Sequence, residues 1–229
     1  MPFAPVNGQQ IHYEDTGGDG PPVVLAHGFL MDLTMFEHQV AALRDQYRVI
    51  TWDERGFGQT EFDGKPFTYW DSAADCLGLL THLGIDRAVV GGMSQGGYLS
   101  LRVALTAPER VRALILLDSG APLDAPEKLA ANQGMVDIWL TAGPVDELAQ
   151  AVATIIIDDP VENPKWIAKW QARPKELMAE PARCLLTRDD VDRPVQEAGA
   201  LGVLVLGDGA GPAQPLAGHV WPAELVGAG

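Results

Sequence analysis

The segment Gly92–Gly96, with the sequence GMSQG, most restricts what this chain can fold into. It follows the short apolar run Ala88–Val90 and precedes a helical pattern that begins near Gln95 and is halted by Pro108. A G-x-S-x-G pentapeptide in this context predicts a sharp strand-to-helix turn. Glycines suit the second position on either side of the serine because side chains there would collide. We therefore expect Ser94 to be strained and exposed.

Short apolar runs alternate with helical patterns in the first half of the chain. The strand-like runs are Gln9–Asp15, Val23–Ala26, Tyr47–Trp52, Ala88–Val90 and Ala113–Leu117, and the helical patterns are Met35–Leu43, Ser72–Leu83 and Leu99–Ala107. The pair Asn7 and Gly8 favours an antiparallel hairpin at the start. Parallel neighbours need crossover connections, so the alternation predicts an α/β fold with a mostly parallel sheet flanked by helices. Ligands of such sheets bind at the carboxyl ends of the strands.

Local signals suggest how individual elements begin and end. Asp71 or Ser72 is the expected N-cap of the second helix, and Gly84 its C-terminal stop. Asp53 and Arg55, in the turn DERGFGQT, are expected to bracket that turn with polar contacts.

The pattern changes after residue 119. Residues 120–190 are helical in pattern and interrupted by prolines, and Gly202–Leu206 then returns to strand character before a tail rich in Gly, Ala and Pro. We expect a core in residues 1–119 that carries the serine turn, an inserted helical cap in 120–190, and a remnant of the core in 191–229.

Charge and composition exclude several classes of function. The 16 basic against 31 acidic residues give a formal charge of −15, which repels nucleic acid and anionic membranes. The N-terminal residues do not resemble a signal peptide, and no apolar run approaches the roughly 18 residues of a membrane span. A soluble, cytoplasmic protein is expected. Cys76 and Cys184 lack metal-site spacing and are interpreted as thiols, so neither a disulfide framework nor a metal site is predicted.

Backbone amides near Ser94 predict an oxyanion hole. The helix that begins near Gln95 directs its free N–H groups toward the serine, which makes the Gln95 N–H one donor. The Phe29 N–H, in the loop after Val23–Ala26, is expected to be the second. His27 in that loop is expected to form a local hydrogen bond rather than act as a base. The alternative for Ser94 is a small residue in a glycine-rich turn.

Several motifs together resemble the α/β-hydrolase family, in particular small cap-bearing members similar to 3-oxoadipate enol-lactonases and related esterases. They are VVLAHGF, WDERGFGQT, GGMSQGG, APERVRALILLDSGA and CLLTRDDV. The resemblance implies the α/β-hydrolase fold and a serine hydrolase that forms an acyl-enzyme with a triad in the order Ser, acid, His. It implies no cofactor and no metal.

The C-terminal part is atypical for this family or truncated. Members carry a further helix, a strand and a closing helix, and the tail is too short for all three, so the resemblance implies that a C-terminal strand and helix are missing or degenerate. Members usually carry GDxD after a late strand, with the second acid catalytic; Ala210 stands there, which leaves Asp208. His219 is the base candidate by chain order, because His12, His38 and His82 fall in earlier elements. The alternatives are a turn aspartate for Asp208 and an ordinary tail histidine for His219. Asp118, at the end of the strand Ala113–Leu117, is the alternative acid.

The expected substrate is a small, partly apolar carboxylic ester or lactone. Trp139 and Trp166, together with Trp170, are candidates for lining its pocket, and helix packing is the alternative explanation for these residues. The same triad would serve a cofactor-free perhydrolase or haloperoxidase. The second class of function is a catalytically impaired binding module or relic, for which the tail is the evidence. An unpaired sheet edge would also favour a homodimer.

Overall fold

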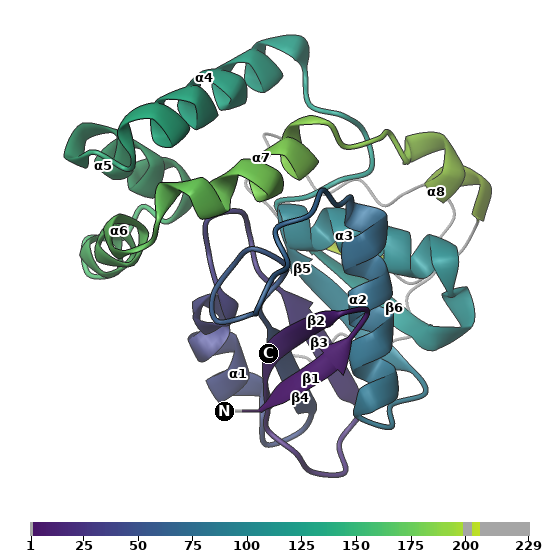
Figure 1. The fold of residues 1–229 in the computed structure, drawn as a ribbon. Helices are drawn as coiled ribbons and strands as arrows, with labels where there is room; N and C mark the ends of the chain where they lie inside the picture. The colour runs from purple at the N-terminus through teal and green to yellow at the C-terminus, as the bar shows by residue number, and fades with distance from the viewer. Residues whose placement is uncertain (1, 199–202, 207–229) are drawn as a thin grey trace.

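The computed structural model describes residues 2–198 and 203–206 (Figure 1). The strands are β1 (Phe3–Val6), β2 (Gln9–Asp15), β3 (Pro22–Ala26), β4 (Arg48–Trp52), β5 (Ala88–Met93), β6 (Val111–Leu117) and β7 (Val203–Leu206). The α-helices are α1 (Glu37–Leu43), α2 (Tyr69–His82), α3 (Gln95–Thr106), α4 (Pro126–Ala142), α5 (Asp146–Ile156), α6 (Asn163–Ala172), α7 (Ala179–Leu186) and α8 (Asp192–Ala198). Short 3-10 turns occupy Leu33–Phe36 (η1), Pro108–Arg110 (η2) and Lys175–Met178 (η3).

The described strands form one sheet in the order β1-β2-β4-β3-β5-β6-β7. Strand β2 pairs antiparallel with β1 and β4, whereas β4, β3, β5, β6 and β7 run parallel to one another. The turn between β1 and β2 places Asn7 (φ 47°) and Gly8 (φ 79°) in the left-handed region, as a tight hairpin turn requires. The predicted mostly parallel sheet and its opening hairpin are therefore confirmed.

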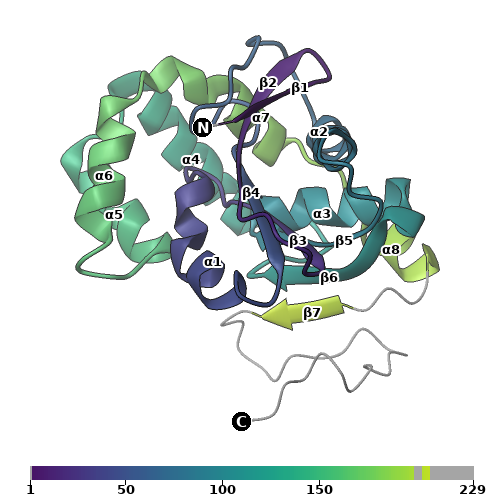
Figure 2. The ribbon, with the colours of Figure 1, turned by 90° about the horizontal axis from the view of Figure 1, so that it is seen from below.

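Alternate residues of the central strands pack against different helices. Val23 and Leu25 of β3 lie in a cluster with Phe36 and apolar residues of α1. Val24 and Ala26 belong to the cluster that includes the buried faces of α2 and α3. Figure 2 shows α1 and α2 on opposite sides of the sheet. Both faces of β3 are thus covered, which explains why its sequence is a continuous apolar run.

Helix α2 differs from the sequence prediction at its start. It begins at Tyr69 rather than Ser72, and Thr68 is its N-cap instead of Asp71 or Ser72. The Asp71 carboxylate accepts hydrogen bonds from the Thr68 backbone N–H and hydroxyl, both at 2.8 Å. These two bonds from Thr68 to Asp71 hold Thr68 as the N-cap, so the helix begins earlier than it would with Asp71 or Ser72 as the cap. The predicted stop is confirmed, since Gly84 follows the helix with φ 67°.

Between β6 and β7 the described chain is mostly helical. Helices α4, α5, α6 and α7 lie together, away from the middle of the sheet (Figure 1). Their apolar side chains form one cluster with Leu30, Met31 and Phe57, which belong to the loops after β3 and β4. The helices therefore pack over the carboxyl ends of these strands. In the described part of the chain, every helix is too short or too polar to cross a bilayer.

Candidate active site

Ser94 lies at the junction of β5 and α3 with an unusual backbone conformation. Its φ of 49° and ψ of −110° fall outside the regions that L-residues normally occupy. The Ser94 N–H donates to the Leu117 carbonyl at 2.9 Å, and the Ser119 hydroxyl donates to the Ser94 carbonyl at 2.8 Å. These contacts with β6 and the following loop hold the strained residue in place. The predicted sharp turn is present, but Ser94 is half-buried rather than exposed as expected, because it lies between β6 and the loop after β3.

The flanking glycines are required by neighbouring backbone. A Cβ atom on Gly92 would lie 2.3 Å from the Ala26 carbonyl oxygen, and one on Gly96 would lie 2.0 Å from the same oxygen. The Cβ of Gly92 would also lie 2.6 Å from the Gly96 carbonyl carbon. The collision expected from the sequence therefore exists, and its main partner is the end of β3. This close approach brings the loop after β3 against the start of α3.

The loop after β3 carries the predicted oxyanion donor Phe29. A Cβ on Gly28 would lie 2.6 Å from the sulfur of Met93, so this loop packs directly on the residue before Ser94. Neither the Phe29 N–H nor the Gln95 N–H donates a hydrogen bond to any residue between 2 and 198. Within residues 2–198 both N–H groups are therefore left without an acceptor. Gln95 directly follows Ser94, and Phe29 directly follows Gly28, which packs on Met93.

His27 is fully buried, and both of its ring nitrogens are used. Nδ1 donates to the Gly28 carbonyl at 2.8 Å, and Nε2 accepts from the Glu54 backbone N–H at 3.1 Å. These partners fix one neutral tautomer. Burial also lowers the pKa of His27. The expectation that His27 hydrogen-bonds locally is confirmed.

Glu54 is an acidic residue that the sequence reasoning did not single out. Its side chain is buried at the carboxyl end of β4, and Oε1 accepts a hydrogen bond from Nε2 of Gln95 at 3.1 Å. The Tyr69 hydroxyl donates to Oε1 of the same glutamine at 3.4 Å. Burial raises the pKa of Glu54 well above its ordinary value of 4.5, and the nearby charge of Asp75 adds to the increase. The available signal was an acid two residues after a buried strand.

Glu54→Gln is expected to gain stability relative to the wild type as pH rises above about 4.5. The folded wild type retains a proton on Glu54 that the unfolded chain releases, so its free energy of unfolding falls between the unfolded and the raised folded pKa. Glutamine has no proton to lose and avoids this decrease. Urea unfolding of both proteins between pH 4.5 and 8.5 measures the difference. A difference in unfolding free energy between the two proteins that does not change with pH would contradict the expectation.

The turn after β4 is held by the side chains of Asp53 and Arg55. Asp53 contacts His12 at 2.6 Å and accepts from the backbone N–H groups of Leu33 and Gln59, each at 2.8 Å. Arg55 pairs with Asp75 of α2. Asp53 thus brackets the turn as expected, whereas Arg55 ties it to α2.

The candidate acids and bases are only partly within the described structure. Asp118 directly follows β6, and the register pairs Met93 with Leu117, so Asp118 and Ser94 follow paired residues at the same sheet edge. Asp118 is exposed and has a φ of 44°. Asp208, Ala210 and His219 lie outside the described residues. The remaining histidines occupy the predicted elements, with His12 in β2, His38 in α1 and His82 in α2.

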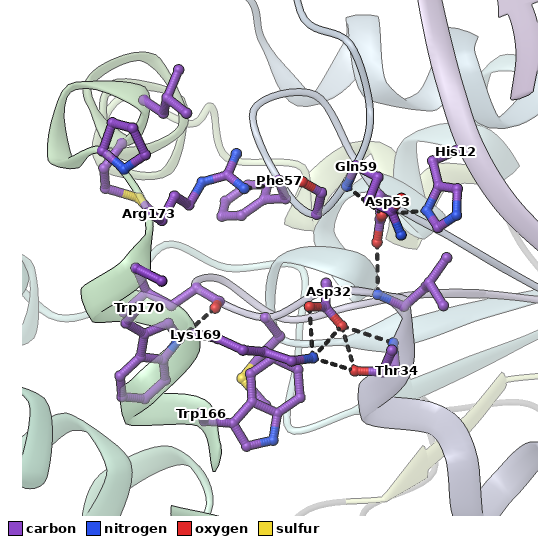
Figure 3. A pocket seen from close by; sticks show the side chains of 18 of the residues that line it. His12, Asp32, Thr34, Asp53, Phe57, Gln59, Trp166, Lys169, Trp170 and Arg173 are labelled. Atoms are coloured by element: carbon purple, nitrogen blue, oxygen red, sulfur yellow. Dashed lines mark hydrogen bonds and ion pairs between the residues drawn. The ribbon is translucent and has the colours of Figure 1, made fainter. Parts of the chain in front are cut away.

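A cavity of about 550 Å³ lies between α6 and the loops after β3 and β4 (Figure 3). Trp139, Trp166 and Trp170 line it, and each is at least nine-tenths buried. Figure 3 shows Lys169 beside Asp32 and Thr34, and its ammonium also lies 4.1 Å from the centre of the Trp166 ring. Ser94 is not among the lining residues. The tryptophans therefore pack the helices together and also form a pocket wall.

Metal binding has no evident site in the described ranges. Among residues 2–198 and 203–206, no three His, Cys, Asp or Glu side chains are grouped so that they could hold a metal ion. Cys76 and Cys184 are free and buried, in agreement with their interpretation as thiols. Burial raises the pKa of Cys76 to about 12, which makes it unreactive.

Several known proteins are similar to this chain in sequence or in fold. A family model described as alpha/beta hydrolase fold matches residues 21–165. The chain is 28% identical to 3-oxoadipate enol-lactonase 2 of Acinetobacter baylyi over 153 residues, covering 61% of this chain and 57% of that protein. A thermophilic esterase from Thermogutta terrifontis is 31% identical, with a TM-score of 0.75 over 87% of this chain and 75% of its own. An enol-lactonase from Burkholderia xenovorans is 30% identical, with a TM-score of 0.77 over 89% and 80%.

The extent of these matches differs between sequence and structure. The chain spans about half the length of the curated relatives it matches, with 44%, 57% and 46% of three of them covered. The family model nevertheless covers more than half of the 229 residues and includes both the loop after β3 and the turn at Ser94. The parallel sheet, the strained serine turn and this match agree, and the chain belongs to the α/β-hydrolase family.

Proposed function

We propose that this protein is a serine hydrolase that cleaves small carboxylic esters or lactones through an acyl-enzyme. The observation that carries the proposal is the strained backbone of Ser94, at φ 49°, together with the N–H groups of Phe29 and Gln95, which donate no hydrogen bond within residues 2–198. Strain of this kind persists where surrounding structure maintains it, and it is typical of functional positions. The family relationship, and likeness to an esterase and an enol-lactonase, support the same reaction class.

Each residue of the proposed site has a distinct role. Ser94 attacks the carbonyl carbon while His219 takes its proton, and Asp208 orients the histidine, with Asp118 as the alternative acid. The Phe29 and Gln95 N–H groups stabilise the negative charge on the carbonyl oxygen, each contributing about 3 to 4 kcal/mol to the barrier reduction. His219 then returns the proton to the leaving oxygen. Water, activated by the same histidine, releases the acyl group and regenerates Ser94.

The cavity beside α6 supports a small and partly apolar substrate. Leu30 and Met31, which line it, directly follow Phe29 in the chain, so the cavity adjoins the loop that carries one oxyanion donor. We assign Trp139 and Trp166 to the wall that contacts the apolar part of the substrate, and residues 120–190 to a cap over the site. A volume of about 550 Å³ is in the range of small-molecule pockets.

Labelling with a fluorophosphonate probe tests the proposal directly. The wild type should be modified at Ser94 alone, as located by peptide mass spectrometry, and should hydrolyse short-chain nitrophenyl esters. Ser94→Ala should lose both the label and turnover. Absence of labelling in a folded wild-type sample would contradict the proposal and favour a binding protein. Labelling without turnover would show a reactive serine but would contradict the complete triad.

A further inference from the structure

We propose that Glu54 is a positioning residue that holds both oxyanion donors in place. The inference rests on the proposed function and extends it to a residue outside the Ser-acid-His set. Glu54 follows β4, Phe29 follows β3, and Gln95 follows β5. These three strands are neighbours in the order β4-β3-β5, and their carboxyl ends meet at one edge of the sheet. Glu54 contacts the segments on both of the other strand ends.

The first contact is made by the backbone of Glu54 and orients the loop after β3. The Glu54 N–H donates to Nε2 of His27 at 3.1 Å, and Nδ1 of His27 donates to the Gly28 carbonyl at 2.8 Å. This carbonyl and the Phe29 N–H belong to the same planar trans peptide, so they point in opposite directions. Fixing the carbonyl therefore fixes the direction of the Phe29 N–H. The hydrogen bond to the carbonyl also polarises this peptide and strengthens its N–H as a donor.

The second contact is made by the side chain and orients the start of α3. Oε1 of Glu54 accepts from Nε2 of Gln95 at 3.1 Å, while Oε1 of Gln95 accepts from the Tyr69 hydroxyl at 3.4 Å. The Gln95 side chain is buried and held at both ends of its amide. Its backbone N–H is the other proposed donor. The side-chain contacts therefore restrict rotation of the first residue of α3 relative to Ser94.

Packing by itself does not account for a carboxyl group at this position. Glu54 is only 1% exposed, and burying a polar group carries a free-energy penalty unless its hydrogen bonds are retained. A leucine would fill a similar volume without this penalty. The hydrogen bond to Gln95 gives the carboxyl group a specific use, because it ties the start of α3 to the same residue whose backbone N–H holds His27 in the loop after β3. The oxyanion fits between the two donors only if these two segments keep a fixed separation.

The test compares Glu54→Leu, which removes the acceptor, with Glu54→Gln, which keeps one. Glu54→Leu should lower kcat about tenfold, with KM changed by less than about twofold, because the oxyanion donors stabilise the transition state rather than the bound substrate. Deleting a donor lowers kcat about 100-fold to 1000-fold, and a donor that is only displaced should cause a smaller loss. Glu54→Gln should restore most of the lost kcat. Affinity for an alkyl boronic acid, which forms a tetrahedral adduct on the serine, should fall with kcat in the leucine variant.

A double-mutant cycle separates positioning from general stability. Gln95→Leu breaks the same contact from the other side, so the double variant Glu54→Leu with Gln95→Leu should be no slower than the slower single variant. If Glu54→Leu does not fold, the kcat of Gln95→Leu provides the test. Glu147→Leu, at an exposed position of α5, is the matched control and should keep the wild-type kcat.

The outcomes distinguish this inference from the proposed function. A wild type that the fluorophosphonate does not label overturns the proposed function and the inference with it. If the wild type is labelled and active, and the folded variants Glu54→Leu and Gln95→Leu keep the wild-type kcat, the inference is overturned and the proposed function stands. Losses that appear only in KM, additive losses in the double variant, or a Glu54→Gln variant as slow as Glu54→Leu would also overturn it.

Discussion

Gly96→Ala should destabilise the protein by about 3 kcal/mol or more, because its new methyl group has no space. The Cβ would lie 2.0 Å from the Ala26 carbonyl oxygen and 2.6 Å from its carbonyl carbon. Both are backbone atoms of β3, which pairs with β4 and β5 in the middle of the sheet and cannot move without breaking those ladders. Urea unfolding monitored by tryptophan fluorescence measures the change.

Gly134→Ala is the matched control for this substitution. Gly134 lies within α4 and is exposed, and a Cβ added there would have no neighbouring atom within 4 Å. Alanine there should stabilise the helix by about 0.5 to 1 kcal/mol, since glycine has the lower helix propensity. Recovery of no folded Gly96→Ala protein would agree with the expectation. An unfolding free energy equal to that of the wild type would contradict the close approach of β3 and α3.

His219→Ala should lower kcat for a nitrophenyl ester by about 10⁴-fold or more, because Ser94 would lose the base that takes its proton. The exposed histidines His38 on α1 and His82 on α2 provide controls. Their alanine variants should keep the wild-type kcat. A His219→Ala variant that turns over as fast as the wild type would remove this residue from the proposed triad.

The same assay identifies the acid. Replacement of a triad aspartate by asparagine lowers kcat by about 10⁴-fold, because the histidine is then held in the wrong tautomer. We expect only one of Asp208→Asn and Asp118→Asn to show a loss of this size. Asp208 is proposed from the order of motifs in the sequence, and Asp118 is supported by its position after β6, beside the strand that precedes Ser94. Full activity in both variants would contradict an Asp-assisted mechanism.

The elements of this fold could be predicted because their signals are local. A few residues are enough to distinguish an apolar run that is covered on both faces, such as β3 or β5, from a helical pattern. A G-x-S-x-G motif between an apolar run and a helical pattern indicates the sharp turn at Ser94. The predicted start of α2 was wrong because several acceptable caps lie close together, and the two hydrogen bonds that Thr68 donates to Asp71 decide between them. Element boundaries depend on such pairings more than on composition.

The candidate site also contains some residues that could be predicted from the sequence and others that could not. Ser94, Phe29 and Gln95 could be proposed from the sequence, since a glycine-flanked serine and a loop after a buried strand are patterns of neighbouring residues. The role of Glu54 could not be predicted, because its position after a strand does not show its partners, His27 and Gln95, which are 27 and 41 positions away. Trp139 and Trp166 were singled out by residue type. Their place in a cavity with Leu30 and Met31 depends on how α4 and α6 pack on the loops after β3 and β4.

The sequence by itself determined the order of strands and helices, the turn at Ser94 and the class of fold, because backbone conformation and apolar periodicity are written in short stretches of chain. Only the tertiary structure decided which buried polar groups meet. Glu54, His27 and Gln95 come together because parallel strands bring the ends of β4, β3 and β5 to one edge of the sheet. Each buried polar group there must find a hydrogen-bond partner, and the available partners are set by sheet order rather than by distance along the chain.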